Sequence, residues 1–412
     1  MDNVDKIFDS FSINNLFNNK TVLQSNYSPD TIPHRNEQIE AVASILAPSL
    51  RGERVSNLFV FGKTGSGKTL SVQHVGNKLK EKMKKMGQDN LRFLYINCKL
   101  KKVADTEYRI LAELINSLGG KVPATGLPTD AVYSRFIEMI DNKKQVIILV
   151  LDEIDQAVKK ISDNFIYTLT RINSELKNAQ ISLVGISNSL TFMENIDPRV
   201  KSSLGEEELV FPPYNALQLQ DILRERSESA FKPGVLDDGV IAKCSAYAAR
   251  EHGDARRALD LLRVAGELAE REGGKKISLK HIDSANQKIE KDKMLDVIES
   301  EPTQFQLVLN AIMNLDDKRE NRRKKGKEEM IDDRMFTGDV YNAYQEICEK
   351  TKNEVLTQRR VGDILGEFDM LGIINARVLS KGRHGRTREI KLMLSPTIKE
   401  KAREILGKSL GL

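Results

Sequence analysis

One short segment, Gly62-Lys63-Thr64-Gly65-Ser66-Gly67-Lys68-Thr69, has the residue types and spacing of a phosphate-binding loop. It follows an apolar stretch at residues 58–61 that predicts a buried strand, so its backbone N–H groups would open into the N-terminus of the next helix. Lys68 would then reach the β and γ phosphates of a nucleotide. The hydroxyl of Thr69 would bind Mg²⁺, because a hard cation prefers oxygen ligands.

Two adjacent carboxylates, Asp152 and Glu153, come directly after an apolar run at residues 146–151. Asp152 would hold Mg²⁺ or one of its water molecules, and Glu153 would polarise the water that attacks the γ phosphate. A phosphate loop set between a strand and a helix, followed by a buried strand that ends in such a pair, is specific for nucleotide binding. We therefore predict ATP/ADP and Mg²⁺ as cofactors.

Two further side chains are candidates for sensing the γ phosphate. Asn188 follows the fourth predicted strand, where its amide would either orient the attacking water or close a turn, and the spacing alone favours neither. Arg256 and Arg257 lie in the first turn of a predicted helix that Asp254 would cap. A helix N-terminus mildly disfavours cations, so an anion such as a γ phosphate is a natural partner for this charge.

The elements that must position these residues alternate between strand and helix. Strands are predicted at residues 58–61, 93–98, 146–151, 181–186 and 208–211, which indicates an α/β domain with a doubly wound parallel sheet. Residues 99–145 are more than one crossover helix requires, so a second helix is expected from Thr129. We assign residues 1–30 to an arm with a short helix near residues 4–11, residues 31–215 to the α/β domain, and residues 216–295 to a small all-α domain.

A third unit at residues 296–412 has three predicted helices and a basic hairpin, the outline of a winged helix-turn-helix. Residues 316–333 are expected to form a charge-rich loop or a frayed helix. Between residues 377 and 391 there are six Lys or Arg and one acid, a pattern that suits contact with DNA phosphates or a minor groove better than an ordinary solvated turn. The predicted DNA-binding residues are Gln358, Arg359, Arg360, Lys381, Arg383, His384, Arg386 and Arg388.

The amino-acid composition limits the classes of partner and the cellular location that we expect for the chain. The net charge of +5 over 412 residues is small, so local basic clusters must decide whether the chain binds nucleic acid. Cys98, Cys244 and Cys348 are too far apart in the sequence to suggest a metal cluster or a disulfide framework. No apolar run approaches the length of a membrane span, and no signal peptide is evident. We therefore expect a cytoplasmic, nucleoid-associated protein with no membrane partner.

In this order, the motifs resemble those of the AAA+ ATPases, and among them the archaeal replication initiators of the origin recognition complex and cell division control type. The resemblance covers nearly the whole chain and includes Pro33-His34-Arg35, the phosphate loop, Asp152-Glu153-Ile154-Asp155, Asn188, residues 197–204, Gly253-Asp254-Ala255-Arg256 and the basic hairpin. It implies an AAA+ core, an all-α lid and a C-terminal winged helix. It also implies that Asn188 is the first sensor, Arg256 the second sensor, and Arg199 an arginine that acts on a neighbouring subunit.

The resemblance implies an ATP-dependent replication initiator that binds double-stranded origin DNA through the winged helix and the helix near residues 129–140. Paralogous initiator subunits and the replicative MCM helicase would be its partners, and ATP hydrolysis would be slow and regulatory. Two alternatives share the same sites, an ATP-switched winged-helix transcription regulator and a clamp-loader-like ATPase. The extra helix and the basic wing favour the initiator over the clamp loader, because a motor needs a loop that translocates along a strand.

Overall fold

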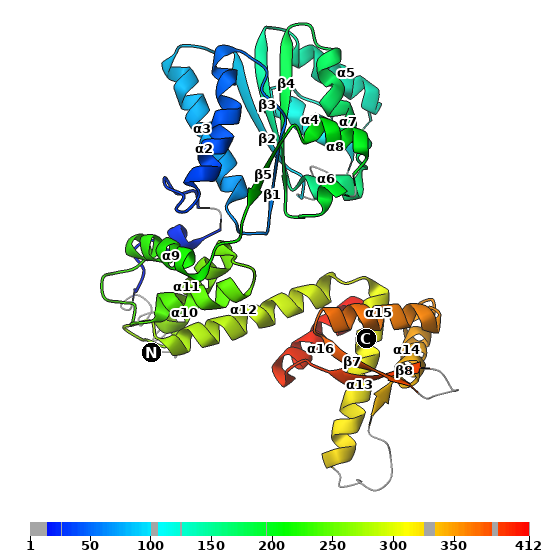
Figure 1. Cartoon of the computed structure of the whole chain (residues 1–412). Helices are drawn as coiled ribbons and strands as arrows, with labels where there is room; N and C mark the ends of the chain where they lie inside the picture. The colour runs from blue at the N-terminus through cyan, green and yellow to red at the C-terminus, as the bar shows by residue number, and fades with distance from the viewer. Residues whose placement is uncertain are drawn as a thin grey trace, which may run out of the picture. The chain divides into compact units, whose positions relative to one another are not determined.

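A computed structural model describes residues 15–25, 27–99, 106–123, 126–194, 196–324, 334–380 and 386–411, with the side chains of residues 321, 323, 324, 380 and 386 also outside the description (Figure 1). The short helix expected near residues 4–11 lies outside these residues. Contacts divide the chain into two units, Met1–Ala285 and Asn286–Leu412. Each unit is described by itself.

The first unit is built on a five-stranded parallel sheet with the strand order β2-β3-β4-β1-β5. The strands are β1 (Leu58–Gly62), β2 (Leu91–Asn97), β3 (Gln145–Asp152), β4 (Ala179–Ser187) and β5 (Glu207–Phe211). All eight residues of β3 are buried, as expected for a strand covered on both faces. The predicted doubly wound α/β class is confirmed.

Helices cover both faces of this sheet (Figure 1). One face packs against α2 (Asn36–Leu46) and α3 (Lys68–Lys85), with η2 (Ala47–Arg51) following α2. The other face packs against α4 (Glu107–Ser117), α5 (Thr129–Ile140), α6 (Ile154–Lys160), α7 (Asn164–Arg171) and α8 (Pro198–Leu204), with η3 (Ile172–Ser174) and η4 (Phe192–Glu194) between them. The extra helix expected from Thr129 is α5.

The sheet brings three functional segments to one edge. The phosphate loop follows β1, Asp152 ends β3, and Asn188 follows β4. Because β3 and β1 both pair with β4, and the carboxyl ends of parallel strands lie at the same edge, these segments converge although they are far apart in the sequence. The fold thus creates a site at the edge where ligands bind in open α/β sheets.

The lid is all-α and carries the N-terminal segment on its surface. It consists of α9 (Ala216–Ala230), α10 (Val240–Arg250), α11 (Ala255–Arg271) and the start of α12 (Leu279–Ser300). Phe17, which precedes η1 (Lys20–Leu23), packs on Phe231 with a ring-centroid distance of 4.7 Å. Lys20, the first residue of η1, forms an ion pair with Glu267. The segment then follows α9, where Thr31 donates to Glu225, before it enters α2.

The second unit has the fold of a winged helix. It contains α13 (Thr303–Lys324), α14 (Thr337–Thr351), α15 (Gln358–Met370) and α16 (Pro396–Leu410), with a sheet of order β6-β8-β7. The strands are β6 (Met335–Phe336), β7 (Ile374–Ser380) and β8 (Arg386–Leu392), paired antiparallel. Of the loop or frayed helix expected at residues 316–333, the structure has helix through Lys324, and residues 325–333 lie outside the description. Helix α16 and strand β6 were not foreseen.

The charged end of α13 is helical because its acids pair with the unforeseen helix α16. Lys399, which is 9% exposed, contacts Asp316, Asp317 at 2.9 Å and Glu320 at 3.7 Å, and Arg403 contacts Asp317. Charges that look like a solvated run in the sequence therefore join two helices.

None of the helices in the described ranges is both long and apolar enough to span a membrane.

Candidate nucleotide site and nucleic-acid interface

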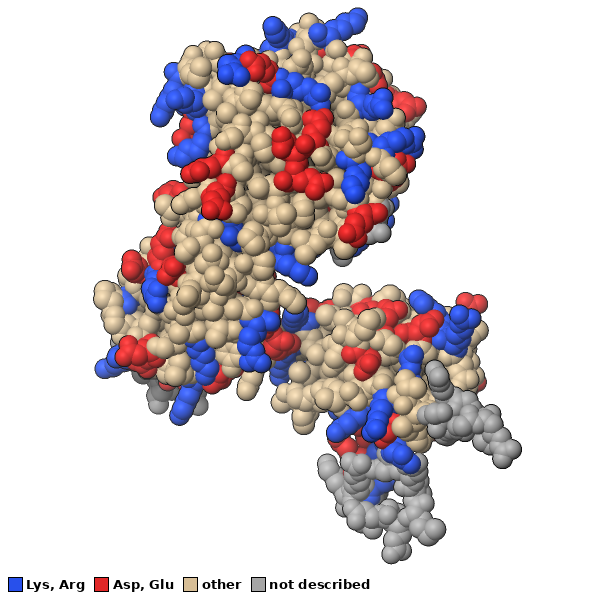
Figure 2. Space-filling model, in the orientation of Figure 1, with Lys and Arg blue, Asp and Glu red and all other residues tan. Residues whose placement is uncertain are grey.

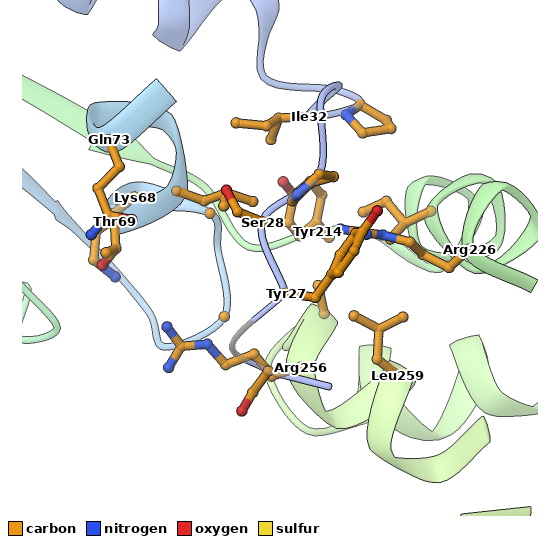
Figure 3. Close-up of a pocket in the computed structure, with 18 of the residues that line it drawn as sticks. Tyr27, Ser28, Ile32, Lys68, Thr69, Gln73, Tyr214, Arg226, Arg256 and Leu259 are labelled. Atoms are coloured by element: carbon orange, nitrogen blue, oxygen red, sulfur yellow. The ribbon is translucent and has the colours of Figure 1, made fainter. Parts of the chain in front are cut away.

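A cavity of about 230 Å³ opens at the carboxyl edge of the sheet, between the α/β core, the lid and the N-terminal segment. The core contributes Lys68, Thr69, Asp152, Glu153 and Asn188 to its wall. The lid contributes Arg226, Arg256 and Leu259, and the N-terminal segment contributes Tyr27 and Ile32 (Figure 3). The cavity thus has a charged end at the phosphate loop and an end lined by aromatic, apolar and cationic side chains.

Lys68 is fixed at the charged end by its own loop. Its Nζ donates to the carbonyl oxygens of Gly62 at 2.7 Å and Lys63 at 2.9 Å, and to Asn188 Oδ1 at 2.9 Å. Burial lowers the pKa of Lys68 to about 8, an effect that the nearby charge of Arg256 adds to and that of Asp152 opposes. The sequence analysis left open whether the Asn188 amide orients the attacking water or closes a turn. In the structure its amide oxygen accepts a hydrogen bond from the loop lysine.

Asp152 is held by three donors and is 3% exposed. Its Oδ2 accepts from Thr69 Oγ1 at 2.8 Å and from the Tyr95 hydroxyl at 2.6 Å, while its Oδ1 accepts from the backbone N–H of Glu153. The adjacent Thr69 and Asp152 oxygens suit Mg²⁺, which takes few protein ligands besides phosphate oxygens and water. Nothing in the sequence had pointed to Tyr95, because the strand position gives no sign of its partner.

Glu153 lies in the left-handed region of backbone conformation, with φ of 54°. Such a conformation is strained for a residue other than glycine and is typical of functional sites. Glu153 lies between the end of β3 and the start of α6, and its carboxylate is in the cavity wall, 3.7 Å from Lys99 Nζ. The carboxylate therefore lies next to Asp152, where the sequence analysis expected a group that polarises water.

The lid meets the phosphate loop at Gly65. A Cβ atom at this position would lie 1.7 Å from Asp254 Oδ1, and φ is +70°, so both the space and the backbone conformation require glycine. Asp254 caps α11 as expected, and Ala255 N–H donates to Gly65 O at 3.3 Å. In Figure 3 the Arg256 side chain extends from the start of α11 toward the loop. Of the predicted loop residues, Gly65, Gly67, Lys68 and Thr69 line the cavity together with Arg256. The other four do not line it: two are buried and two are exposed, respectively Gly62 and Ser66, and Lys63 and Thr64.

Arg35 holds the phosphate loop through hydrogen bonds. Its place in the Pro33-His34-Arg35 motif did not indicate this role. Its side chain donates to Ser66 O at 2.8 Å, to His34 O at 2.9 Å and to Pro212 O at 2.5 Å. Its guanidinium lies 3.8 Å from the centroid of the Tyr214 ring. Burial lowers the pKa of Arg35, and its carbonyl partners satisfy the donors of the buried cation.

Arg199 is not part of this cavity. It lies in the first turn of α8, where its guanidinium donates to both carboxylate oxygens of Asp197 at 3.1 and 2.9 Å and lies over the Tyr167 ring. These contacts hold the pKa of Asp197 down to about 2. The side chain is 69% exposed and so is open to another molecule.

The predicted DNA-binding residues fall into two groups. Gln358, Arg359 and Arg360 form the exposed first turn of α15, which Thr357 caps. Arg388 is half-buried and donates from Nη1 to Gly362 O at 2.6 Å, so it joins β8 to α15 within the protein. Lys381, Arg383 and His384 lie outside the described residues, as does the side chain of Arg386. Their DNA contacts stay predictions.

The titration of Lys68 offers a test of phosphate binding at the loop. A polyphosphate beside the ammonium would raise its pKa from about 8 toward the ordinary range near 10.4. In this window the complex binds more protons than the free protein, so nucleotide affinity should fall as pH rises. Calorimetric titration with ATP at pH 9, in two buffers of different ionisation enthalpy, should show uptake of about one proton. Lys68→Arg keeps a charge that does not titrate there and should show no uptake. Equal uptake by both proteins would exclude this assignment.

The Tyr95 hydroxyl offers a test of metal binding at Asp152. Tyr95→Phe removes one of the donors that orient the carboxylate, and loss of such an outer contact typically weakens metal binding by about 10-fold or more. We expect the Mg²⁺ concentration needed for half-maximal ATP binding to rise by about that factor. Tyr133→Phe, which removes a hydroxyl contact to Glu175 away from the cavity, is the matched control. An unchanged Mg²⁺ requirement in Tyr95→Phe would mean that Asp152 is not a metal ligand.

Comparison with known proteins gives matches along most of the chain. Residues 52–193 match a AAA domain, residues 220–287 the Cdc6 AAA+ ATPase-type lid domain, and residues 296–402 the CDC6 C-terminal winged helix domain. Over 398 residues the chain is 52% identical to the ORC1-type DNA replication protein of Pyrococcus abyssi, with 95% of this chain and 91% of the relative covered. The corresponding protein of Pyrococcus furiosus is 54% identical over 381 residues, with 92% and 87% covered.

A solved structure is similar along its whole length. The structure of the Aeropyrum pernix ORC1 protein in complex with DNA has a TM-score of 0.81 and 43% sequence identity, with 95% of this chain and 97% of that chain covered. The similarity includes the α/β core, the lid and the winged helix that the geometry had already defined. The chain therefore belongs to the family of ORC1-type DNA replication proteins, which are AAA+ ATPases with a C-terminal winged helix.

Proposed function

We propose that this protein initiates DNA replication by binding double-stranded origin DNA, with the nucleotide in its cavity acting as a switch. The observation that carries the proposal is the contact between lid and phosphate loop, where Asp254 abuts Gly65 and Arg256 faces the cavity. Loss of the γ phosphate on hydrolysis would remove negative charge beside both the core residues and the lid residue Arg256, so it would affect the core and the lid together. The family membership of the chain supports replication as the process that this switch controls.

ATP or ADP would lie with its phosphates at Lys68 and its base toward Tyr27, Ile32 and Leu259. The Tyr27 ring lies 4.7 Å from the guanidinium of Arg226, which gives a flat surface for a base. Thr69 and Asp152 would hold Mg²⁺, whose charge would neutralise the phosphates. Glu153 would accept a proton from the attacking water, and Asn188 would hold Lys68 in place, so that its amide would serve the loop as well as the γ phosphate.

DNA would bind at the winged helix, with the first turn of α15 at the duplex. Arg359 and Arg360 are exposed at a helix N-terminus, where the helix field disfavours a cation, and a phosphate or the edge of a guanine would be a favourable partner. Among the described residues on the face shown in Figure 2, Lys and Arg are interspersed with Asp and Glu. DNA affinity would therefore depend on local groups such as these and the wing tip, together with α5 as a second contact.

The remaining partners follow from the same proposal. The exposed Arg199 would reach the nucleotide of a neighbouring copy or paralogue, which would make hydrolysis depend on assembly and keep it slow in the single chain. The assembled initiator would recruit the replicative MCM helicase, and the protein would work in the cytoplasm at the nucleoid. A switch of this kind needs few turnovers, unlike a motor.

Mapping of bound sites on the host genome tests the proposal as a whole. We expect binding to concentrate where replication starts, with footprints that differ between ATP-bound and ADP-bound protein. Footprints on the same DNA with Lys68→Ala, which should lose nucleotide binding, serve as the control. Binding spread over promoters, with no enrichment where replication starts, would show a transcription regulator instead.

Substitution at α15 tests the DNA-binding surface. Arg359→Ala with Arg360→Ala should weaken duplex binding and reduce the slope of log affinity against log salt by about 1–2, because fewer counterions are released. Lys401→Ala with Lys408→Ala removes the same charge from the exposed side of α16 and should change the slope little. Affinity and slope should be measured for both proteins over several salt concentrations. Equal effects of the two double variants would mean that net charge, and not α15, governs binding.

A further inference from the structure

Helix α8 carries Arg199 on its exposed first turn and is anchored to the fold at both ends. At the start of the helix, Asp197 N–H donates to Asp163 Oδ2 at 2.9 Å, and the Asp197 carboxylate caps the first turn by accepting from Arg199 N–H at 2.8 Å. Along its inner side Val200 and Leu204 are buried in the core. The helix has only seven residues, so its direction depends on these few contacts.

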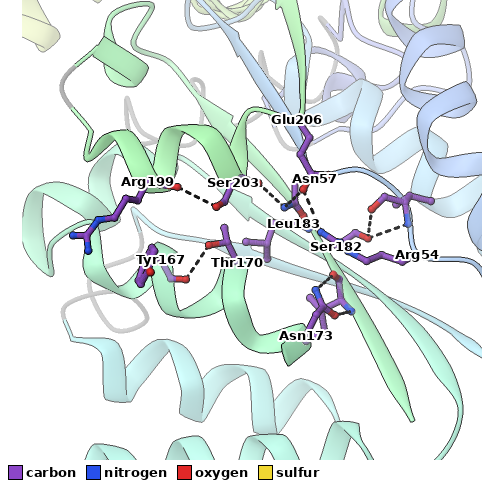
Figure 4. A network of polar contacts seen from close by, with 12 residues as sticks. Arg54, Asn57, Tyr167, Thr170, Asn173, Ser182, Leu183, Arg199, Ser203 and Glu206 are labelled. Carbon is purple, nitrogen blue, oxygen red and sulfur yellow. Dashed lines mark hydrogen bonds and ion pairs between the residues drawn. The ribbon is translucent and has the colours of Figure 1, made fainter. Parts of the chain in front are cut away.

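The last turn of α8 is held by one buried amide, that of Asn57 (Figure 4). Asn57 is 1% exposed and comes directly before β1. Its Nδ2 donates to Ser203 O at 2.7 Å and to Glu206 Oε1 at 3.3 Å, while its Oδ1 accepts from Leu183 N–H at 2.8 Å. The last carbonyl oxygens of a helix have no partner within the helix, so the donation to Ser203 satisfies one of them.

The backbone of Asn57 adds to this connection. Its N–H donates to Glu206 Oε2 at 2.9 Å, and its carbonyl oxygen accepts from Glu207 N–H at 3.0 Å. Asn57 therefore joins the end of α8 to β4 and to the start of β5. Within α8, Ser203 Oγ donates to Arg199 O at 3.0 Å, so the residue that Asn57 caps also contacts the backbone of the arginine.

We infer that Asn57 is a positioning residue for Arg199. It fixes the angle at which α8 presents the guanidinium to a neighbouring molecule, without any contact to that molecule or to the nucleotide of its own chain. This inference rests on the proposed action of Arg199 on the nucleotide of another subunit. The role needs an amide at residue 57, because the carbonyl of Ser203 requires a donor and the N–H of Leu183 requires an acceptor.

A mixture of two variants tests this inference, because one variant supplies the arginine and the other supplies the nucleotide site on which the arginine acts. Full-length protein with Arg199→Ala keeps its own nucleotide site and needs an arginine from outside, whereas protein with Glu153→Gln cannot turn over ATP and can only donate its arginine. On duplex DNA carrying the host origin, the mixture should hydrolyse ATP faster than the sum of its components. Adding Asn57→Ala to the Glu153→Gln donor should reduce this gain by at least about 10-fold.

A matched control distinguishes positioning from general damage to the sheet. Asn173 makes an equivalent pair of hydrogen bonds to β4, from Nδ2 to Ile181 O at 2.8 Å and from Ile181 N–H to Oδ1 at 2.7 Å, without contacting α8 (Figure 4). Asn173→Ala in the donor should therefore leave the gain intact at a similar cost in thermal stability. Protein that carries only Asn57→Ala should bind ATP with the same affinity as the unsubstituted chain.

A second donor variant serves if Asn57→Ala does not fold. Asn57→Asp with Glu206→Gln keeps an acceptor for Leu183 N–H and a hydrogen bond to residue 206, and it removes the donor to Ser203. It also moves the negative charge from Glu206, which pairs with Arg54 at 3.3 Å, to residue 57, so Glu206→Gln alone in the donor is its control. The double variant should also fail to rescue. The inference would be overturned if a donor with either Asn57 variant raised ATP hydrolysis by the mixture as much as the Glu153→Gln donor does. If Glu153→Gln itself gives no rescue, the action of Arg199 on another subunit is wrong, and the role of Asn57 falls with it.

Discussion

The buried guanidinium of Arg35 connects the parts on which the cavity depends. It donates at once to Ser66 in the phosphate loop and to Pro212, where the chain leaves β5 for the lid, and it stacks on Tyr214. A cation with 2% exposure is costly to bury unless carbonyl groups accept its hydrogen bonds. The shape of the loop and the course of the connection therefore have to be compatible with the same side chain.

The lid meets the phosphate loop through a few close contacts at the start of α11. Asp254 caps α11 with the carboxylate that abuts Gly65, so the start of α11 and the position of Arg256 depend on the same group. On the other side, Thr31 and His34 contact Glu225 and Asp221 of α9. Core, lid and N-terminal segment thus line a single site.

The sequence was sufficient where function depends on local spacing. The phosphate loop, the Asp152-Glu153 pair and the five strands follow from patterns that are contiguous in the chain, and the structure has each strand within two residues of the predicted bounds. Contacts between distant residues were not predictable, as with Tyr95 on Asp152 or Lys399 on the acids of α13. Ser395-Pro396 does carry a helix-start signal that would have indicated α16, whereas the acids of α13 gave no sign of their partners.

The N-terminal segment makes the order of synthesis matter for this site. Asn18 Nδ2 donates to Phe231 O across 213 residues of sequence, and Phe17 packs on the same phenylalanine. At about 5–20 residues per second, a ribosome needs about 10–40 seconds to make the lid after it has made this segment. During that interval the α/β core is synthesised, ending with β5, but the wall containing Tyr27 has no surface on which to dock. The wall that contains Tyr27 is therefore among the first parts of the cavity to be synthesised, but it can dock only after the lid has been made.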